Sequence, residues 1–566
     1  MAIRRRWRIV PLLVLFSYWA VAQSVPAAAR AGATPWFEIT FPASVHAEPI
    51  TGRGFLVITG ADKPEPRLQI GSWTQEVPIF GVDVSQLQPG EAAVIDATTL
   101  GYPLKSLTEI PAGDYYVQAV MNVYTEFPRA DGHTIWAHMD QWEGQDFNAS
   151  PGNLYSKPQR IHFDQELHSV KLELRELIPQ VQVPPDSDWV KRIKFQSKLL
   201  SEFWGKPVYL GATILLPKEY DQHPNVRYPV IYEQDHFNLD PPLYFREERL
   251  EHAENELWKQ YANAGFELQQ QWRGPNFPRV IAVRFQHPTP YFDDSYAVNS
   301  ANDGPYGDAI MQELIPYIEE HFRVIREPWA RMLTGASTGG WESLALQVFH
   351  PDFFGGTWTF FPDPIDFRRY QLVNIYDDDN AFKVPGFQWV QYERPWRRTV
   401  EGQVLGTLRQ LSQWEEVLGS HGRSGQQLDA WEAVYGPVGA DGYPQPLWDK
   451  VTGKIDHTVA LYMRDHGFDL DYYLQQNWNR VGPKLVDKIH IYCGDMDNYY
   501  LNLAVYKMQE VLQTAKSPAA NATFEYGRPM KGHGWTPFSQ VELVQNMVEF
   551  IAKHAPAGAG TQNWKY

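Results

Sequence analysis

Residues 335–339 read Gly-Ala-Ser-Thr-Gly, a Gly-x-Ser-x-Gly pattern that sets a hydroxyl nucleophile between two small residues. An apolar stretch at 330–333 precedes it, and a helical pattern from 340 to 350 follows and stops before Pro351. A strand, a tight turn and a helix in this order are typical of a nucleophile elbow, which projects its serine from the top of a sheet. The pentapeptide alone would indicate only a turn. Within this context we expect Ser337 to be a nucleophile.

A serine hydroxyl needs a base to take its proton and an acid to orient that base. A strand-like run at 489–494 leads into a loop that carries Asp497, which we expect to be the acid. Asp495 is the close alternative, and turn acids without a function are the other interpretation. His533 lies between two glycines in a loop before the last helix, which lets the ring turn toward a serine. The order Ser, Asp, His along the chain is that of α/β-hydrolases.

The negative charge that develops on a carbonyl oxygen during acyl transfer needs two peptide N–H donors. The N–H of Thr338, which follows the expected nucleophile, is the first candidate. The second donor is expected in the loop at 233–238, which follows a strand-like run at 228–232.

Several short motifs together resemble the "putative esterase" (esterase D-like) family of α/β-hydrolases. That family includes S-formylglutathione hydrolases, feruloyl and acetylxylan esterases, enterochelin esterases and mycolyltransferases. The matching segments are Tyr-Pro-Val-Ile-Tyr at 228–232, Asn-Asp-Gly-Pro-Tyr-Gly-Asp at 302–308, Glu-Leu-Ile-Pro at 313–316, Gly-Ala-Ser-Thr-Gly-Gly at 335–340, Pro-Asp-Phe-Phe-Gly at 351–355, Gly494-x-x-Asp497 and Gly532-His533-x-Trp535.

The resemblance covers about residues 200–555, and it implies that Ser337, Asp497 and His533 form a catalytic triad. It also places the second oxyanion N–H at Phe237. At residues 235–236 this chain has Asp-His, where many members of the family have His-Gly. The oxyanion loop is therefore where this chain departs from the family pattern.

The elements needed to position these residues can be seen in the hydrophobic pattern of 189–555. The run at 207–217 indicates a strand, and continuous apolar runs at 228–232 and 278–285 indicate buried parallel strands. Amphipathic runs at 308–322 and 541–554 indicate helices. We therefore expect an α/β-hydrolase fold, with a mostly parallel sheet and helices on both faces. Residues 556–566 would form a C-terminal tail.

The segment 34–177 has a different pattern, with short strands, turn signals and no helical periodicity. It predicts an immunoglobulin-like β-sandwich, joined to the hydrolase part by a proline-rich linker at 178–188. The expected strands are 36–41, 54–59, 67–71, 92–96, 115–124, 159–163 and 169–174.

A third pattern interrupts the hydrolase part at 365–482, where strand signals fade and leucines repeat at helical spacing. This indicates a helical insertion, which is either a cap over a pocket or ordinary core of an enlarged domain. An acidic run at 377–380 could bind a cation, but we expect a solvated loop.

Residues 1–22 have the pattern of a signal peptide, with arginines, an apolar run and small residues at the expected cleavage site. We expect the protein to be exported, to the periplasm or beyond the cell, with no stable membrane span. A formal net charge of −17 disfavours nucleic acid as a partner. The single cysteine, Cys493, permits no intramolecular disulfide.

These observations predict a secreted serine carboxylic-ester hydrolase that works through an acyl-enzyme on a small-molecule or carbohydrate-linked ester. Such chemistry requires neither a cofactor nor a metal ion. An acyltransferase or a peptidase could use the same triad, and an inactive binding protein on a hydrolase scaffold is the alternative from another class.

Overall fold

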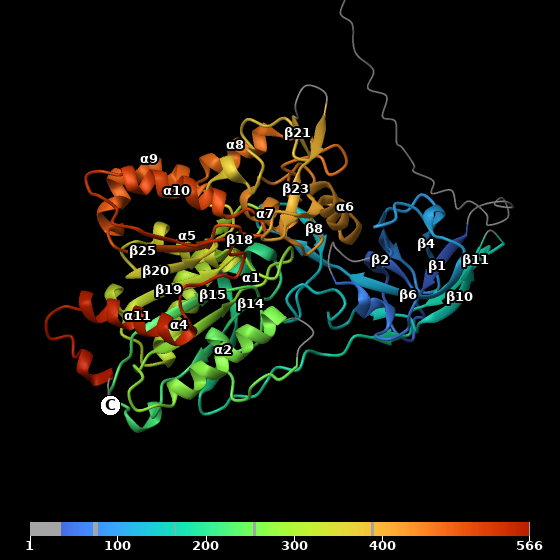
Figure 1. The fold of residues 1–566 in the computed structure, drawn as a ribbon. Coiled ribbons are helices and arrows are strands. Elements are labelled where there is room, and N and C mark those ends of the chain that lie inside the picture. The colour runs from blue at the N-terminus through green and yellow to red at the C-terminus, as the bar shows by residue number, and fades with distance from the viewer. Residues whose placement is uncertain (1–34, 72–76, 165, 253–255, 386–389, 565–566) are drawn as a thin grey trace, which may run out of the picture.

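A computed structural model describes residues 35–71, 77–164, 166–252, 256–385 and 390–564. The expected signal peptide, residues 1–22, lies outside the described residues. Figure 1 shows a β-rich N-terminal part, in blue and cyan, beside a larger part in which helices flank a sheet. None of the described helices is both long and apolar enough to cross a membrane.

The larger part is built on an eight-stranded sheet with the order β13-β14-β16-β15-β19-β20-β25-β26. The strands from β16 to β26 in this order are parallel, whereas β14 is antiparallel to both of its neighbours. The bounds are β13 (Val190–Ser197), β14 (Val208–Leu215), β15 (Val230–Gln234), β16 (Ile281–Gln286), β19 (Arg331–Ala336), β20 (Gly356–Phe360), β25 (Ile489–Gly494) and β26 (Thr523–Gly527).

Both faces of this sheet are covered, as its apolar strands require. In β15, Val230 belongs to the same buried cluster as Ile310, whereas its neighbour Ile231 belongs to the cluster of Leu268 and Val544. Successive residues of a strand point to opposite faces, so the two clusters lie on opposite sides. The helices of the larger part outside the insertion are α1 (Lys198–Trp204), α2 (Glu256–Trp272), α3 (Tyr306–Ala309) continuing through a π-helical turn into α4 (Ile315–His321), α5 (Thr338–Phe349), α10 (Asn502–Thr514) and α11 (Gln540–His554).

The N-terminal part is all-β. One sheet has the order β11-β1-β4, and the other follows the path β12-β9-β6-β2-β3-β5, with β10 also paired to β6. The strands are β1 (Trp36–Thr40), β2 (Ile50–Thr59), β3 (Ile79–Leu87), β4 (Ala93–Ile95), β5 (Gly101–Tyr102), β6 (Gly113–Val123), β9 (Leu154–Tyr155), β10 (Gln159–Phe163), β11 (Ser169–Glu173) and β12 (Glu176–Leu177), with a separate hairpin of β7 (Thr125–Pro128) and β8 (Thr134–Ala137).

One strand expected in this part is wrong. Residues 67–71 do not form a strand, because Pro66–Gln69 is a turn of 3-10 helix. Proline at the first position of that turn has the φ angle a helical start needs, and it has no N–H to give to a sheet. The backbone N–H of Arg67 donates to Oε1 of Gln118 at 2.8 Å and not to a neighbouring strand, and its side chain lies over the ring of Tyr155.

The insertion at 365–482 is not purely helical. It holds α6 (Leu408–Leu418), α7 (Gln427–Tyr435), α8 (His457–Asp465) and α9 (Leu470–Leu485), and also two hairpins, β21 (Lys383–Pro385) with β22 (Gln391–Glu393) and β23 (Pro395–Arg398) with β24 (Val404–Thr407). Strands of three or four residues are too short to give a period-two signal in the sequence.

The insertion also contacts the N-terminal part. Arg53 on β2 donates hydrogen bonds to the backbone oxygens of Val417 (2.9 Å) and Glu416 (3.0 Å) at the end of α6. Tyr102 packs edge-on against Trp414 with 5.6 Å between ring centroids. The N-terminal sheet therefore packs against α6 of the insertion.

Candidate active site

Ser337 lies in the turn between β19 and α5 and has a left-handed φ of 57°. A non-glycine residue rarely adopts this conformation, which marks local strain of the kind found at nucleophile elbows. The two glycines are required by space. A Cβ on Gly335 would lie 2.0 Å from the oxygen of Gly339, and one on Gly339 would lie 2.0 Å from the oxygen of Gln234. The pentapeptide seen in the sequence is thus dictated by close backbone approach.

Asp497 and His533 come together across two neighbouring strand ends. The Nδ1 of His533 lies 2.8 Å from Oδ2 of Asp497, whose side chain is fully buried. The other carboxylate oxygen accepts the N–H groups of Tyr499 (2.8 Å) and Leu501 (3.2 Å), which fixes the acid in its loop. The backbone N–H of His533 is held by the Oδ1 of Asn498 at 2.9 Å.

Asp495, the alternative acid, lies elsewhere in the same loop. Its Oδ1 accepts the backbone N–H of Lys531 at 3.2 Å, so it ties the loop after β25 to the loop that carries His533. Because the carboxylate that contacts the imidazole is that of Asp497, the geometry favours Asp497 over Asp495 as the orienting acid.

A cavity of about 430 Å³ opens beside these residues, and both Ser337 and His533 line it. Aromatic rings and amide groups form much of its wall. The aromatic members of the lining are Tyr244, Tyr261, Phe360, Phe361, Trp396, Trp431, Tyr499 and Phe538, and the amide members are Gln234, Gln371, Gln426, Gln427 and Gln540. Trp396, Gln426, Gln427 and Trp431 belong to the insertion, which therefore walls the cavity.

Asp363 is a residue of the site that the sequence analysis missed. Its Oδ1 lies 3.4 Å from the hydroxyl of Ser337, at the long end of hydrogen bonding. Its Oδ2 accepts Tyr296 (2.7 Å), Gln427 (3.1 Å) and Trp431 (3.4 Å), so it links the elbow to α7 of the insertion. Burial raises the pKa of this carboxyl. Asp363 follows the end of β20, and the strand-end rule that selected Asp497 could have found it.

The two expected oxyanion donors, Thr338 and Phe237, differ in their position relative to the cavity. Thr338 is the first residue of α5, where N–H groups have no partner within the helix and point beyond its end. Phe237 turns its ring toward the N-terminal part, edge-on to Trp142 at 5.2 Å between centroids. Among the described residues, the cavity lining includes Asp235 and His236 from this loop but not Phe237.

A buried arginine, Arg284, binds both ends of the loop after β15. Arg284 on β16 makes two hydrogen bonds to the carboxylate of Glu233, at 2.9 and 3.0 Å. A third N–H group of the same guanidinium donates to Oδ1 of Asn238 at 2.7 Å. A planar guanidinium bound on both sides fixes the two ends of the loop at 233–238.

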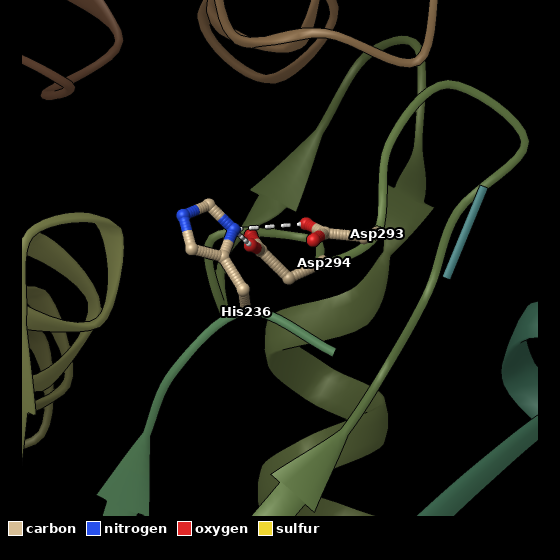
Figure 2. Close-up of side chains that lie close together, drawn as sticks. All are labelled: His236, Asp293 and Asp294. Atoms are coloured by element: carbon tan, nitrogen blue, oxygen red, sulfur yellow. Dashed lines mark hydrogen bonds and ion pairs between the residues drawn. The ribbon is translucent and has the colours of Figure 1, made fainter. Parts of the chain in front are cut away.

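His236, Asp293 and Asp294 form a second polar cluster in the wall of the site (Figure 2). The sequence analysis noted His236 only as a departure from the family pattern and did not single out the paired aspartates, which follow a buried strand. Burial acts to lower the pKa of His236, but the Asp293 and Asp294 carboxylates raise it well above its ordinary value. The acidic run at 377–380 behaves differently, since Asp378 pairs with Arg394 at 3.0 Å.

Comparison of the chain with known proteins tests the family resemblance noted in the sequence. Residues 209–429 match the model of the Esterase family, described as "Putative esterase". No curated protein matches. The chain is similar to a ferulic acid esterase structure (15% identity, covering 64% of this chain and 98% of that one, TM-score 0.35).

Two further similar structures are fluorophosphonate-binding serine hydrolase F of Staphylococcus aureus (12% identity, 64% of this chain and 98% of that one, TM-score 0.32) and an S-formylglutathione hydrolase of Agrobacterium tumefaciens (11% identity, 64% and 94%, TM-score 0.32). Similarities of this size carry no argument about function. The family match confirms the resemblance seen in the sequence. Residues 209–429 therefore carry the pattern of the esterase family.

Proposed function

We propose that this protein is an exported serine carboxylic-ester hydrolase with Ser337, His533 and Asp497 as its catalytic triad. The observation that carries the proposal is a strained serine and an Asp-bound histidine that line one cavity. A hydroxyl nucleophile, a base and an acid that orients the base are the parts that acyl transfer needs.

In the proposed mechanism, the hydroxyl of Ser337 turns from Asp363 toward His533, which costs little because the contact it leaves is 3.4 Å long. Its oxygen bonds to the ester carbonyl carbon while its proton passes to Nε2 of His533. The Nδ1–H of the resulting imidazolium stays bound to Asp497, which stabilises the positive charge. His533 then gives the proton to the departing alcohol.

Water then hydrolyses the acyl-enzyme, with His533 acting again as base and then as acid. His533 takes a proton from water, the hydroxide adds to the acyl carbon, and the bond to Ser337 breaks as its oxygen regains the proton. The N–H of Thr338 at the start of α5 is the proposed first oxyanion donor. A backbone N–H of the loop at 235–238 is the second, with Phe237 as the position implied by the family pattern.

The strand order of the larger part supports an α/β-hydrolase fold for residues 189–555, with the insertion at 365–482 as a cap. The order of the triad along the chain is also that of this fold. The domain boundaries at 34–177 and 178–188, the immunoglobulin-like class of the N-terminal part, and export through residues 1–22 belong to the same proposal and rest on the sequence.

The test is hydrolysis of a small panel of esters, namely p-nitrophenyl acetate, p-nitrophenyl butyrate, methyl ferulate and acetylated xylan, by the wild type and by Ser337→Ala. We expect the variant to lose about 10⁴-fold to 10⁶-fold in kcat. A variant that hydrolyses a cleaved ester as fast as the wild type would overturn the proposal.

Labelling by a fluorophosphonate separates an enzyme from an inactive binding protein, since only an activated serine reacts. We expect wild type to be labelled and Ser337→Ala to remain unlabelled. Product analysis with added alcohol or amine acceptors then distinguishes hydrolysis from acyl transfer.

A further inference from the structure

His236, Asp293 and Asp294 converge from two neighbouring loops. His236 follows β15, and the two aspartates lie between β16 and β17 (Asn299–Ser300). Figure 2 shows both carboxylates directed at the same side of the imidazole ring. Nδ1 of His236 lies 3.1 Å from Oδ1 of Asp293 and 3.4 Å from Oδ2 of Asp294.

These distances are those of ligands that share a metal ion. One atom from each of the three side chains lies within 4.8 Å of the others. An ion held by nitrogen and oxygen ligands at about 2.0–2.2 Å sets neighbouring ligand atoms roughly 3 to 3.5 Å apart. One imidazole with two carboxylates suits a divalent transition metal better than Ca²⁺ or Mg²⁺, which favour oxygen ligands alone.

A third carboxyl group, that of Glu342, lies beside this cluster. Glu342 on α5 is fully buried, and among the described residues neither of its oxygens has a hydrogen-bond donor. It adjoins Asp294, whose Oδ2 is approached among the described residues only by Nδ1 of His236 at 3.4 Å, and the ring of His287 approaches Glu342 only to 4.0 Å. A carboxyl group buried without partners is costly unless it keeps its proton or a positive charge compensates it. Burial and the neighbouring Asp294 raise the pKa of Glu342 well above its ordinary value, so Glu342 is an outer group beside the cluster and not itself a ligand.

The buried guanidinium of Arg284 is not free to supply a positive charge, because Glu233 and Asn238 bind it. No lysine or arginine is among the described residues that line the cavity. A protonated His236 would offset only one of the two carboxylates that face it.

We propose that His236, Asp293 and Asp294 bind one divalent transition-metal ion, with Zn²⁺ and Mn²⁺ as the best-matched ions. Glu342 lies behind Asp294 as an outer carboxylate. The ion ties the loop after β15 to the loop after β16 in the wall of the cavity that holds Ser337. His236 is two-fifths exposed, so an ion can reach the site from the cavity. The sequence analysis expected no metal, because serine esterase chemistry requires none. The three residues of the proposed metal site become neighbours only in the folded chain.

The experiment uses the full chain after removal of metal with EDTA and gel filtration. Binding of ZnCl₂ and MnCl₂ is followed by titration calorimetry, with metal content measured by mass spectrometry. We expect one ion per chain and a rise in melting temperature when the ion is present in excess, because the folded state binds it preferentially. Glu342→Gln should weaken binding by roughly 10-fold to 100-fold, as loss of an outer partner does.

His236→Ala should abolish the site, and Asp293→Asn provides a second variant at a partly exposed position. The matched control is His421→Ala, because His421 pairs with Asp441 at the same 3.1 Å but, within the part of the chain that the structure describes, belongs to no cluster of three possible metal ligands. That control should bind as the wild type does. Circular dichroism confirms that each variant is folded.

Three results would overturn the proposal: no Zn²⁺ or Mn²⁺ bound to the wild type, unchanged binding in folded His236→Ala, or binding of Ca²⁺ or Mg²⁺ alone. Ser337→Ala should bind the ion normally. The metal site and the esterase proposal can therefore fail separately.

Discussion

Replacement of Asp497 by asparagine tests whether this carboxylate sets the state of the proposed base. Asp497 is fully buried, and its Oδ2 faces Nδ1 of His533 at 2.8 Å. Its Oδ1 holds the backbone of Tyr499 and Leu501. An asparagine keeps the size of the side chain and the acceptor for the backbone. However, it presents an amide that donates to the ring where the carboxylate accepted.

The magnitude follows from this reversal. With a donor at Nδ1, the neutral ring must carry its proton on Nε2, which is the nitrogen that should accept the proton of Ser337. Water cannot repair the contact, because the acid has no exposed surface. We expect kcat to fall about 10⁴-fold, as in a triad whose histidine is held in the wrong tautomer. That loss equals roughly 5.5 kcal/mol of transition-state stabilisation.

The assay is kcat and KM for p-nitrophenyl acetate, with circular dichroism to establish that the variants are folded. Asp495→Asn is the matched control, since Asp495 lies in the same loop but contacts the backbone of Lys531 and not the ring. We expect the control to lose less than about tenfold. The reasoning is refuted if Asp497→Asn stays within about tenfold of the wild type, or if Asp495→Asn loses as much.

Three further predictions concern stability, each measured as the midpoint of urea unfolding. Asp363→Ala should lower the free energy of unfolding by about 1–3 kcal/mol, because the buried hydroxyl of Tyr296 and the side-chain N–H groups of Gln427 and Trp431 then lack their acceptor. An unchanged urea midpoint would contradict this network. Arg53→Ala should lose about 1.5–3 kcal/mol through its bonds to α6, whereas the exposed Arg175→Ala should change little. Equal effects of these two substitutions would argue against docking through Arg53. Burial raises the pKa of Asp303 to about 7, so between about pH 4 and pH 7 the folded state keeps a proton that the unfolded state loses, and stability falls as pH rises. Asp303→Asn should therefore gain stability relative to wild type between pH 5 and pH 8, by up to about 4 kcal/mol, and a difference that does not depend on pH would refute this.

Local patterns in the sequence were sufficient for the parts of the site whose causes are local. The elbow at Ser337 needs small residues at fixed spacing, and the structure shows which backbone atoms a side chain would strike at Gly335 and Gly339. The rule that loops at strand ends carry functional side chains selected Asp497 and His533, which the fold brings to 2.8 Å. The same rule would have included Asp363 only if β20, which the sequence analysis did not predict, had been recognised as a strand.

Local patterns also predicted strands and helices with a clear pattern, such as α11 and the strands β14, β15, β16 and β25 of the main sheet, but not β13 or β20. They failed where elements are very short, as in the hairpins of the insertion, or where proline changes the backbone, as at Pro66–Gln69. In these places the hydrophobic pattern covers too few residues to outweigh turn chemistry.

The sequence by itself determined the esterase family pattern, the elbow and the order of its proposed partners, because each follows from short motifs and their order along the chain. Only the tertiary structure decided that Asp363 lies under Ser337, that Phe237 turns its ring away from the cavity, and that His236 meets Asp293. The physical reason is that His236 and Asp293 are 57 residues apart. They become neighbours because β15 and β16 pair side by side in the sheet, and strand order is a property of the whole fold.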